Sequence, residues 1–163
     1  MNNQELSKQI QKLRALFDRT ENASGGDIEI QSHWAKYLCV LSAGFLENAL
    51  YEIYGDFCKR AASEHVANFA NSSLSRIQNP KTNRFIEIAS SFKKSWGEDL
   101  EAFSDEDGRK DAIDSIMTNR HLIAHGKISN ISVAQLKEYL DKAIEIVDFI
   151  ENQLKRGAVK KIS

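Results

Sequence analysis

Arg120, His121 and His125 lie close together in the segment Asn119-Arg120-His121-Leu122-Ile123-Ala124-His125-Gly126. A guanidinium keeps its charge and holds a phosphate or carboxylate through parallel N–H donors. An imidazole both accepts and donates protons near neutral pH, so it suits general acid or base catalysis. These residue types at this spacing indicate chemistry on an anionic substrate.

The segment lies at the end of a predicted helix. Apolar residues at helical spacing over 113–117 form a stripe, and Arg120 continues that stripe, so we expect it to point inward and to need an anionic partner. Gly126 is typical of a residue that ends a helix in a left-handed conformation. Within a straight helix Arg120 and His125 point about 140° apart. They converge on one ligand only if the helix end unwinds or a second copy of the segment supplies the missing half.

Two other interpretations of these residues compete with catalysis. His121 and His125 are spaced i, i+4, as in helical zinc sites, but Leu122 stands where a zinc protease carries its glutamate. No third ligand is evident, so we expect no metal site and no cofactor. The simplest structural interpretation has Arg120 and His125 capping helix carbonyls or pairing with a carboxylate such as Glu47.

The composition sets the class of protein. The 163 residues are enough for one domain, 42% are hydrophobic and 28% are charged, as in ordinary globular proteins. A net charge of -1 disfavours a nucleic-acid protein that relies on a broad basic surface, but allows a small anion site. Cys39 and Cys58 are too few for a disulfide framework, so we expect reduced core cysteines. Because residues 1–5 lack the features of a signal peptide and no apolar run could span a membrane, we expect a cytoplasmic protein.

Apolar spacing predicts helices over nearly the whole chain, joined by short loops in an up-and-down bundle. We expect one domain over residues 1–157 and a flexible basic tail over 158–163. The residues 21–27, with Gly25-Gly26, separate the first two helices, and Asn79-Pro80 marks a later turn. The predicted helices cover approximately residues 6–17, 28–62, 65–78, 84–96, 109–125 and 133–154.

Three details of this pattern make specific predictions. Gly44, inside the long second helix, indicates close packing of another element at that point. Ser132 and Gln135 form a capping box at the start of the last helix. That helix carries an apolar seam over 133–154, which we expect to pack against a partner helix within the chain or across a dimer.

The segment Arg120-His121-Leu122-Ile123-Ala124-His125-Gly126 resembles the R-x4-6-H motif of the HEPN superfamily, in its Arg-polar-x-x-x-His form. The resemblance covers most of the chain after the first helix. Over this part, the chain is similar to the RiboL-PSP-associated HEPN branch. It includes residues 34–54, with Gly44-Phe45-Leu46-Glu47-Asn48, then Gln78-Asn79-Pro80-Lys81 and the final helix. The polar position after the arginine is often Asn or Asp in the family, and here it is His121.

The resemblance implies a metal-independent endoribonuclease that acts as a homodimer, with the two motifs facing each other across the interface. His125 would move the proton of a ribose 2′-hydroxyl, and Arg120 would hold the phosphate that this hydroxyl attacks. Asn119 and His121 would orient the phosphate or the imidazole. Glu47, on the central helix, would orient Arg120.

The expected products are a 2′,3′-cyclic phosphate and a 5′-hydroxyl, and DNA is not expected as a substrate because it lacks the 2′-hydroxyl. The family context suggests a toxin or phage-defence role, with a cognate antitoxin or operon partner. Two alternatives stay open. One is a non-catalytic HEPN module that binds RNA, a nucleotide or a partner protein, and the other is a helical adaptor that recruits a protein through its last helix.

Overall fold

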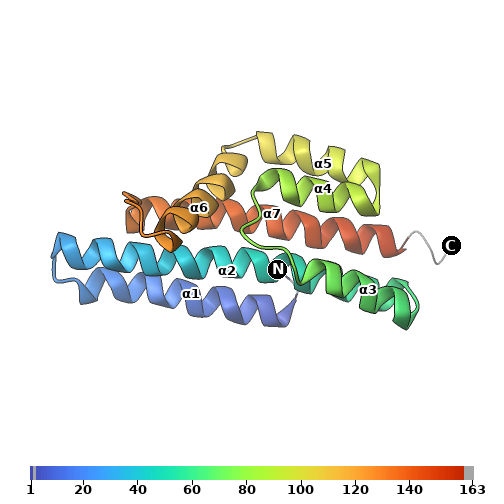
Figure 1. Ribbon diagram of the computed structural model, residues 1–163, viewed down its shortest axis with the longest axis horizontal. Helices are drawn as coiled ribbons and strands as arrows, with labels where there is room; N and C mark the ends of the chain where they lie inside the picture. Colours follow the sequence, from blue (N-terminus) through green and yellow to red (C-terminus); the bar gives the residue numbers. More distant parts are fainter. Residues whose placement is uncertain (2, 160–163) are drawn as a thin grey trace.

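The computed structural model describes residues 1 and 3–159, which form seven helices joined by short connections (Figure 1). The helices are α1 (Gln4–Ala23), α2 (Ile28–Ala61), α3 (Glu64–Leu74), α4 (Thr82–Phe92), α5 (Lys94–Asp105), α6 (Arg109–Ala124) and α7 (Val133–Val159). This part of the chain contains no strand, which confirms the predicted all-α helical bundle. None of these helices is long and apolar enough to cross a membrane.

Helix α2 is the central element of the bundle. Asp27 caps its first turn by accepting hydrogen bonds from the backbone N–H groups of Glu29 and Ile30, at 2.8 and 3.1 Å. Buried side chains occupy more than one side of α2, because α1, α3, α6 and α7 all pack against it. In Figure 1, α1 lies alongside α2 over most of its own length. Because α6 packs against α2, this central helix holds the residues of α6 in place.

Helix α7 begins with the capping box that the sequence predicts. Ser132 Oγ accepts a hydrogen bond from the Gln135 N–H, and Gln135 Oε1 accepts one from the Ser132 N–H, both at 3.2 Å. The apolar seam of α7 is buried against α2 and α6 of the same chain. The partner that the seam needs is therefore supplied within the chain. The helix extends to Val159, so the expected tail of 158–163 starts inside it, and residues 160–163 lie outside the described residues.

The predicted helix over 84–96 is wrong, because the chain breaks at Lys93 and forms two helices. Lys93 has φ -160 and ψ 126, and it ends α4 and begins α5. The prediction failed because the apolar spacing continues from Phe92 to Trp96 across the break. Gly97 allows the two helices to cross closely, since an added Cβ would lie 1.7 Å from Ser90 Oγ.

The expectation of close packing at Gly44 is also wrong within the protomer. No heavy atom of the described residues lies within 4 Å of a Cβ built there, apart from the helix itself and its chain neighbours, and the residue is exposed. Cys39 and Cys58 match their prediction as free, buried thiols. Cys39 Sγ donates to the Ile116 carbonyl at 3.5 Å, which joins α2 to α6 in the core.

Candidate active site at the end of helix α6

Helix α6 carries the Arg–His motif in its last turn. Ile113, Ile116 and Met117 are fully buried, as the apolar stripe predicts. Arg120, the next position of the stripe, is only half-buried. Within the described part of the chain, no hydrogen bond or ion pair engages its guanidinium. The Arg120 side chain thus points only partly inward, and the described residues supply no anionic partner for it.

A different arginine is the buried one. Arg109, at the start of α6, is 9% exposed and donates to Glu145 at 2.7 Å, to Asp107 at 3.0 Å and to the Phe103 carbonyl at 3.1 Å. Its guanidinium also lies 4.0 Å from the centre of the Phe103 ring. Hydrogen bonding to Glu145 raises the pKa of Arg109, so the group stays charged. Arg109 was not predicted from the sequence, because an anionic partner was expected only for Arg120.

The end of α6 is closed by a backbone motif that fixes His125. Gly126 has φ +64, its N–H bonds to the Ile123 carbonyl at 3.1 Å, and the Lys127 N–H bonds to the Leu122 carbonyl at 2.8 Å. This is the Schellman arrangement, and it makes His125 the C-cap residue, as predicted. The His125 side chain is exposed, at a position held by the turn that follows it.

The two histidines of the motif lie next to each other. His121 and His125 are both exposed, and their ring centroids are 4.4 Å apart with an angle of 56° between the planes. The His125 N–H still bonds to the His121 carbonyl at 3.2 Å, so the helix does not unwind before its cap. Arg120 and His125 therefore keep the divergence of about 140° that a regular helix imposes. Within one protomer the two imidazoles therefore lie next to each other, and the Arg120 guanidinium lies on a different side of the helix.

Asn119 holds the loop that follows the motif. Its Nδ2 donates to the Ser115 carbonyl at 2.9 Å, and its Oδ1 accepts from Ser129 Oγ at 2.8 Å. The Ser129 side chain is buried, which makes the second bond a fixed link between α6 and the residues before α7. The amide of Asn119 is thus committed to the fold and supports the position of the motif indirectly.

Glu47 has a different partner from the expected one. Its carboxylate accepts a hydrogen bond from the Asn79 backbone N–H, and within the described residues it makes no ion pair with Arg120. Asn79 has φ 49, so this bond stabilises a turn in a conformation uncommon for a residue other than glycine. Two of the segments that resemble the HEPN branch, around Glu47 and around Asn79, are thus joined to each other.

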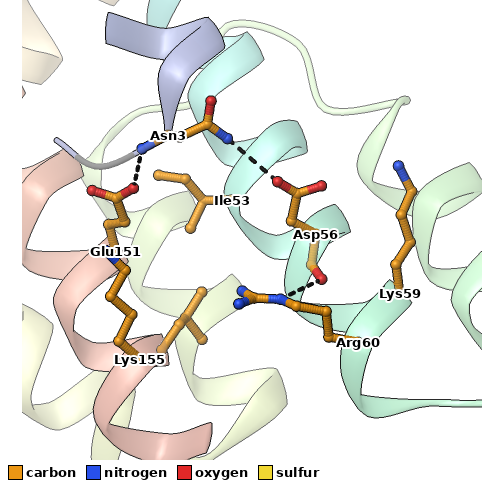
Figure 2. Close-up of a pocket in the computed structure, with 8 residues that line it drawn as sticks. Asn3, Ile53, Asp56, Lys59, Arg60, Glu151 and Lys155 are labelled. Carbon is orange, nitrogen blue, oxygen red and sulfur yellow. Dashed lines mark hydrogen bonds between the residues drawn. The ribbon is translucent and has the colours of Figure 1, made fainter.

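A cavity of about 480 Å³ lies away from the motif, between α2, α7 and the start of the chain (Figure 2). Asn3 donates from its backbone N–H to Glu151 at 2.6 Å and from its side chain to Asp56 at 3.4 Å. Both carboxylates in the cavity therefore fasten the N-terminus, as the dashed lines in Figure 2 show. The cavity contains neither Arg120 nor His125, and its contacts are accounted for by the fold.

The fold and the motif now define the class of protein. The protein is an all-helical bundle in which one helix ends with an Arg–polar–x–x–x–His motif, as the resemblance to HEPN domains implies. A model of the RiboL-PSP-HEPN family matches residues 3–156, and the chain belongs to that family. Comparisons with the curated proteins and with the solved structures give no match.

Proposed function

We propose that the protein is a metal-independent endoribonuclease whose site is the end of α6. The observation that carries the proposal is the contrast between the two arginines on this helix. Arg109 is buried and fully paired, whereas Arg120 is half-buried and has no partner among the described residues. A partly desolvated guanidinium binds a phosphate more strongly than an exposed one, because water competes less. RNA phosphate is the anion that the family assignment favours.

The proposed reaction is transesterification within the RNA. His125 accepts the proton of a ribose 2′-hydroxyl, and the 2′-oxygen forms a bond to the adjacent phosphorus. The bond from phosphorus to the 5′-oxygen breaks, and this oxygen receives a proton from an imidazole. The products are a 2′,3′-cyclic phosphate and a 5′-hydroxyl. Arg120 holds the phosphate and stabilises the charge that builds on its oxygens in the transition state.

The proposal includes a homodimer in which the two motifs face each other. Because Arg120 and His125 diverge on a regular helix end, a second copy is needed to bring a guanidinium and an imidazole to one phosphate. Two apolar side chains of α2 offer a surface for that copy, since Tyr37 is 51% exposed and Val40 is 42% exposed. Val40 follows Cys39, which touches α6 one turn before Arg120.

The remaining motif residues have supporting roles in this proposal. His121 lies beside His125 and orients it or contacts the RNA. Asn119 and Glu47 act through the fold, by holding the loop after the motif and the turn before α4. The proposed setting is the cytoplasm, in a toxin or phage-defence system in which RNA cleavage stops growth and an antitoxin or operon partner restrains it.

A second candidate function is a non-catalytic HEPN module that binds RNA, a nucleotide or a partner protein. His121 favours it, because an imidazole stands where the family often has Asn or Asp and its ring packs against His125. A histidine held against another ring at 4.4 Å is less free to move between substrate and solvent. This module would bind RNA without cutting it.

The deciding experiment incubates the purified protein with end-labelled RNA in EDTA. Wild type is compared with Arg120→Ala and His125→Ala, and with Arg76→Ala and His65→Ala as matched exposed controls. We expect cyclic-phosphate ends from wild type and both controls, and a loss of about 10²–10⁴-fold in the two motif variants. Equal cleavage by wild type and His125→Ala would contradict the proposal. RNA binding without cleavage by the folded wild type would favour the second candidate.

The dimer is tested separately with Tyr37→Glu and Val40→Glu. A charge on a contact surface that excludes water weakens association, so we expect monomers in analytical ultracentrifugation and loss of cleavage. Gln31→Glu, an exposed position on a different face of the same helix, is the control that should stay dimeric. Monomeric variants that cut RNA at the wild-type rate would rule out a site shared between two copies.

A further inference from the structure

His121 and His125 are spaced i, i+4 at the end of α6, and their rings lie next to each other. Both side chains are exposed, and among the described residues neither imidazole has a hydrogen bond or ion pair to a side chain. Their ring centroids are 4.4 Å apart. Two histidines at i and i+4 on one helix face bind a single ion in helical zinc sites, through Zn–N bonds of about 2.0–2.1 Å. We propose that His121 and His125 form a bidentate site for one divalent cation of the Zn²⁺ type.

The backbone holds the two ligands in place before the ion arrives. His121 lies within α6, and His125 is the C-cap residue whose N–H bonds to the carbonyls of His121 and Leu122. The left-handed turn at Gly126 fixes the cap. Little backbone entropy is therefore lost on binding. The end of α6 also carries the negative pole of the helix, which favours a cation there.

The charges around the pair select the kind of ion. Arg120 and Lys127 flank the histidines and repel any cation that binds by charge alone. Mg²⁺ and Ca²⁺ prefer oxygen ligands and gain little from imidazoles. Zn²⁺, Ni²⁺ and Cu²⁺ form strong bonds to imidazole nitrogen, which offsets the repulsion. The site should thus discriminate between these two groups of ions.

The sequence-based expectation of no metal site depended on the lack of a third ligand. Within residues 1 and 3–159 no group of three or more His, Cys, Asp or Glu side chains could hold an ion. Two histidines nevertheless form a chelate, and water fills the open positions. Such an ion exchanges readily and is unlike the closed structural sites of zinc proteins. The site is a regulatory one, since the imidazole that binds the ion cannot also transfer a proton.

The inhibition of RNA cleavage by this ion rests on the proposed function, but the binding does not. The binding test therefore uses no RNA. Tag-free protein is titrated with ZnCl₂ in a calorimeter, for wild type, His121→Ala and His125→Ala. The matched controls are His33→Ala and His65→Ala, which remove exposed histidines elsewhere on the surface. Circular dichroism verifies that every variant is folded.

We expect one Zn²⁺ per protomer in wild type and in both controls, and no saturable heat with MgCl₂. Loss of an outer-shell partner alone costs about 10–100-fold in metal affinity, so loss of either ligand should weaken binding at least that much. Wild-type affinity in His121→Ala, no saturable Zn²⁺ binding by wild type, or one ion per two protomers would each overturn the proposal. None of these results depends on whether the protein cleaves RNA.

Discussion

Arg109 Nε donates to Glu145 Oε2 over 2.7 Å and ties the first turn of α6 to the middle of α7. The same guanidinium lies over the Phe103 ring, which stacks on Phe149 of α7 at 4.4 Å. The start of the motif helix is thus fastened by charge and by aromatic packing. Its other end is held by the backbone cap, by the link between Asn119 and Ser129 and by the packing of Ile123 against the core. The charged anchor of α6 therefore lies at the end of the helix opposite the Arg–His motif.

The two arginines of α6 should separate stability from function. Arg109→Ala removes charge-assisted hydrogen bonds and an aromatic contact from a buried position, so we expect a loss of about 2–3 kcal/mol in the free energy of unfolding. Arg120→Ala removes no hydrogen bond or ion pair among the described residues and should change that free energy by less than about 0.5 kcal/mol. Urea denaturation of both variants measures the difference. A strongly destabilised Arg120→Ala would mean that this residue has a structural partner.

Gly97 and Gly44 make a matched pair of helical glycines. Gly97→Ala places a Cβ 2.9 Å from Ser90 Cβ, so α4 and α5 must move apart, at a cost of about 1–3 kcal/mol. Gly44→Ala meets no atom within 4 Å and should stabilise α2 by about 0.5–1 kcal/mol. Thermal unfolding of the two variants should shift in opposite directions. A stabilised Gly97→Ala would show that the α4–α5 contact is loose.

The Asn119–Ser129 hydrogen bond can be tested by a double-mutant cycle. Asn119→Ala and Ser129→Ala should each cost about 1 kcal/mol of stability, and their effects should overlap because both remove the same bond. We expect a coupling energy of about 0.5–1 kcal/mol from the cycle. If the two losses simply add, the loop after the motif is not held by this bond.

Burial of the Cys39 thiol predicts a loss of stability at high pH. Its pKa rises from 9.0 to about 12, so the folded protein keeps a proton that the unfolded chain releases. The contribution of Cys39 is fully present below pH 9 and is lost as the pH rises from about 9 toward 12. At pH 10 the loss is about 1 kcal/mol relative to pH 8. Urea denaturation at both values measures it, and Cys39→Ala should show a smaller decrease. Burial also raises the pKa of Tyr54, so part of the decrease should persist in the variant.

Zinc should inhibit the proposed nuclease without unfolding it. Ions bound by His121 and His125 occupy the imidazole that moves the proton, so cleavage should fall as Zn²⁺ saturates the pair and return after EDTA is added. The measurement is the rate of cyclic-phosphate formation across a ZnCl₂ series, with MgCl₂ as the parallel control. Full activity at saturating Zn²⁺ would show that His125 does not transfer the proton through a ring nitrogen that binds the ion.

Local patterns predicted most of the fold. The caps at Ser132 and Gly126 and the buried stripe over 113–117 depend on neighbouring residues, and the structure contains all of them. The break at Lys93 was missed because apolar spacing of three and four residues continues across it. The close crossing of α4 and α5 at Gly97 does not alter the spacing of the apolar residues, so this spacing could not predict it.

The site was predictable only in part, for a related reason. Spacing along one helix placed His121 beside His125 and separated Arg120 from His125. The partner of Glu47 is set by a contact between distant segments, the bond from the Asn79 N–H to the Glu47 carboxylate, which no periodic pattern encodes. The same holds for Arg109, whose partner Glu145 is 36 positions away.

The turn at Gly126 requires a left-handed backbone conformation, but it has space for a side chain. Its φ is +64, yet a Cβ built there has no neighbour within 4 Å. An L-alanine would be strained by about 1–2 kcal/mol in this backbone conformation, whereas its mirror image, D-alanine, favours it. A semisynthetic protein with D-alanine at position 126 should therefore hold His125 more rigidly than the protein with glycine does.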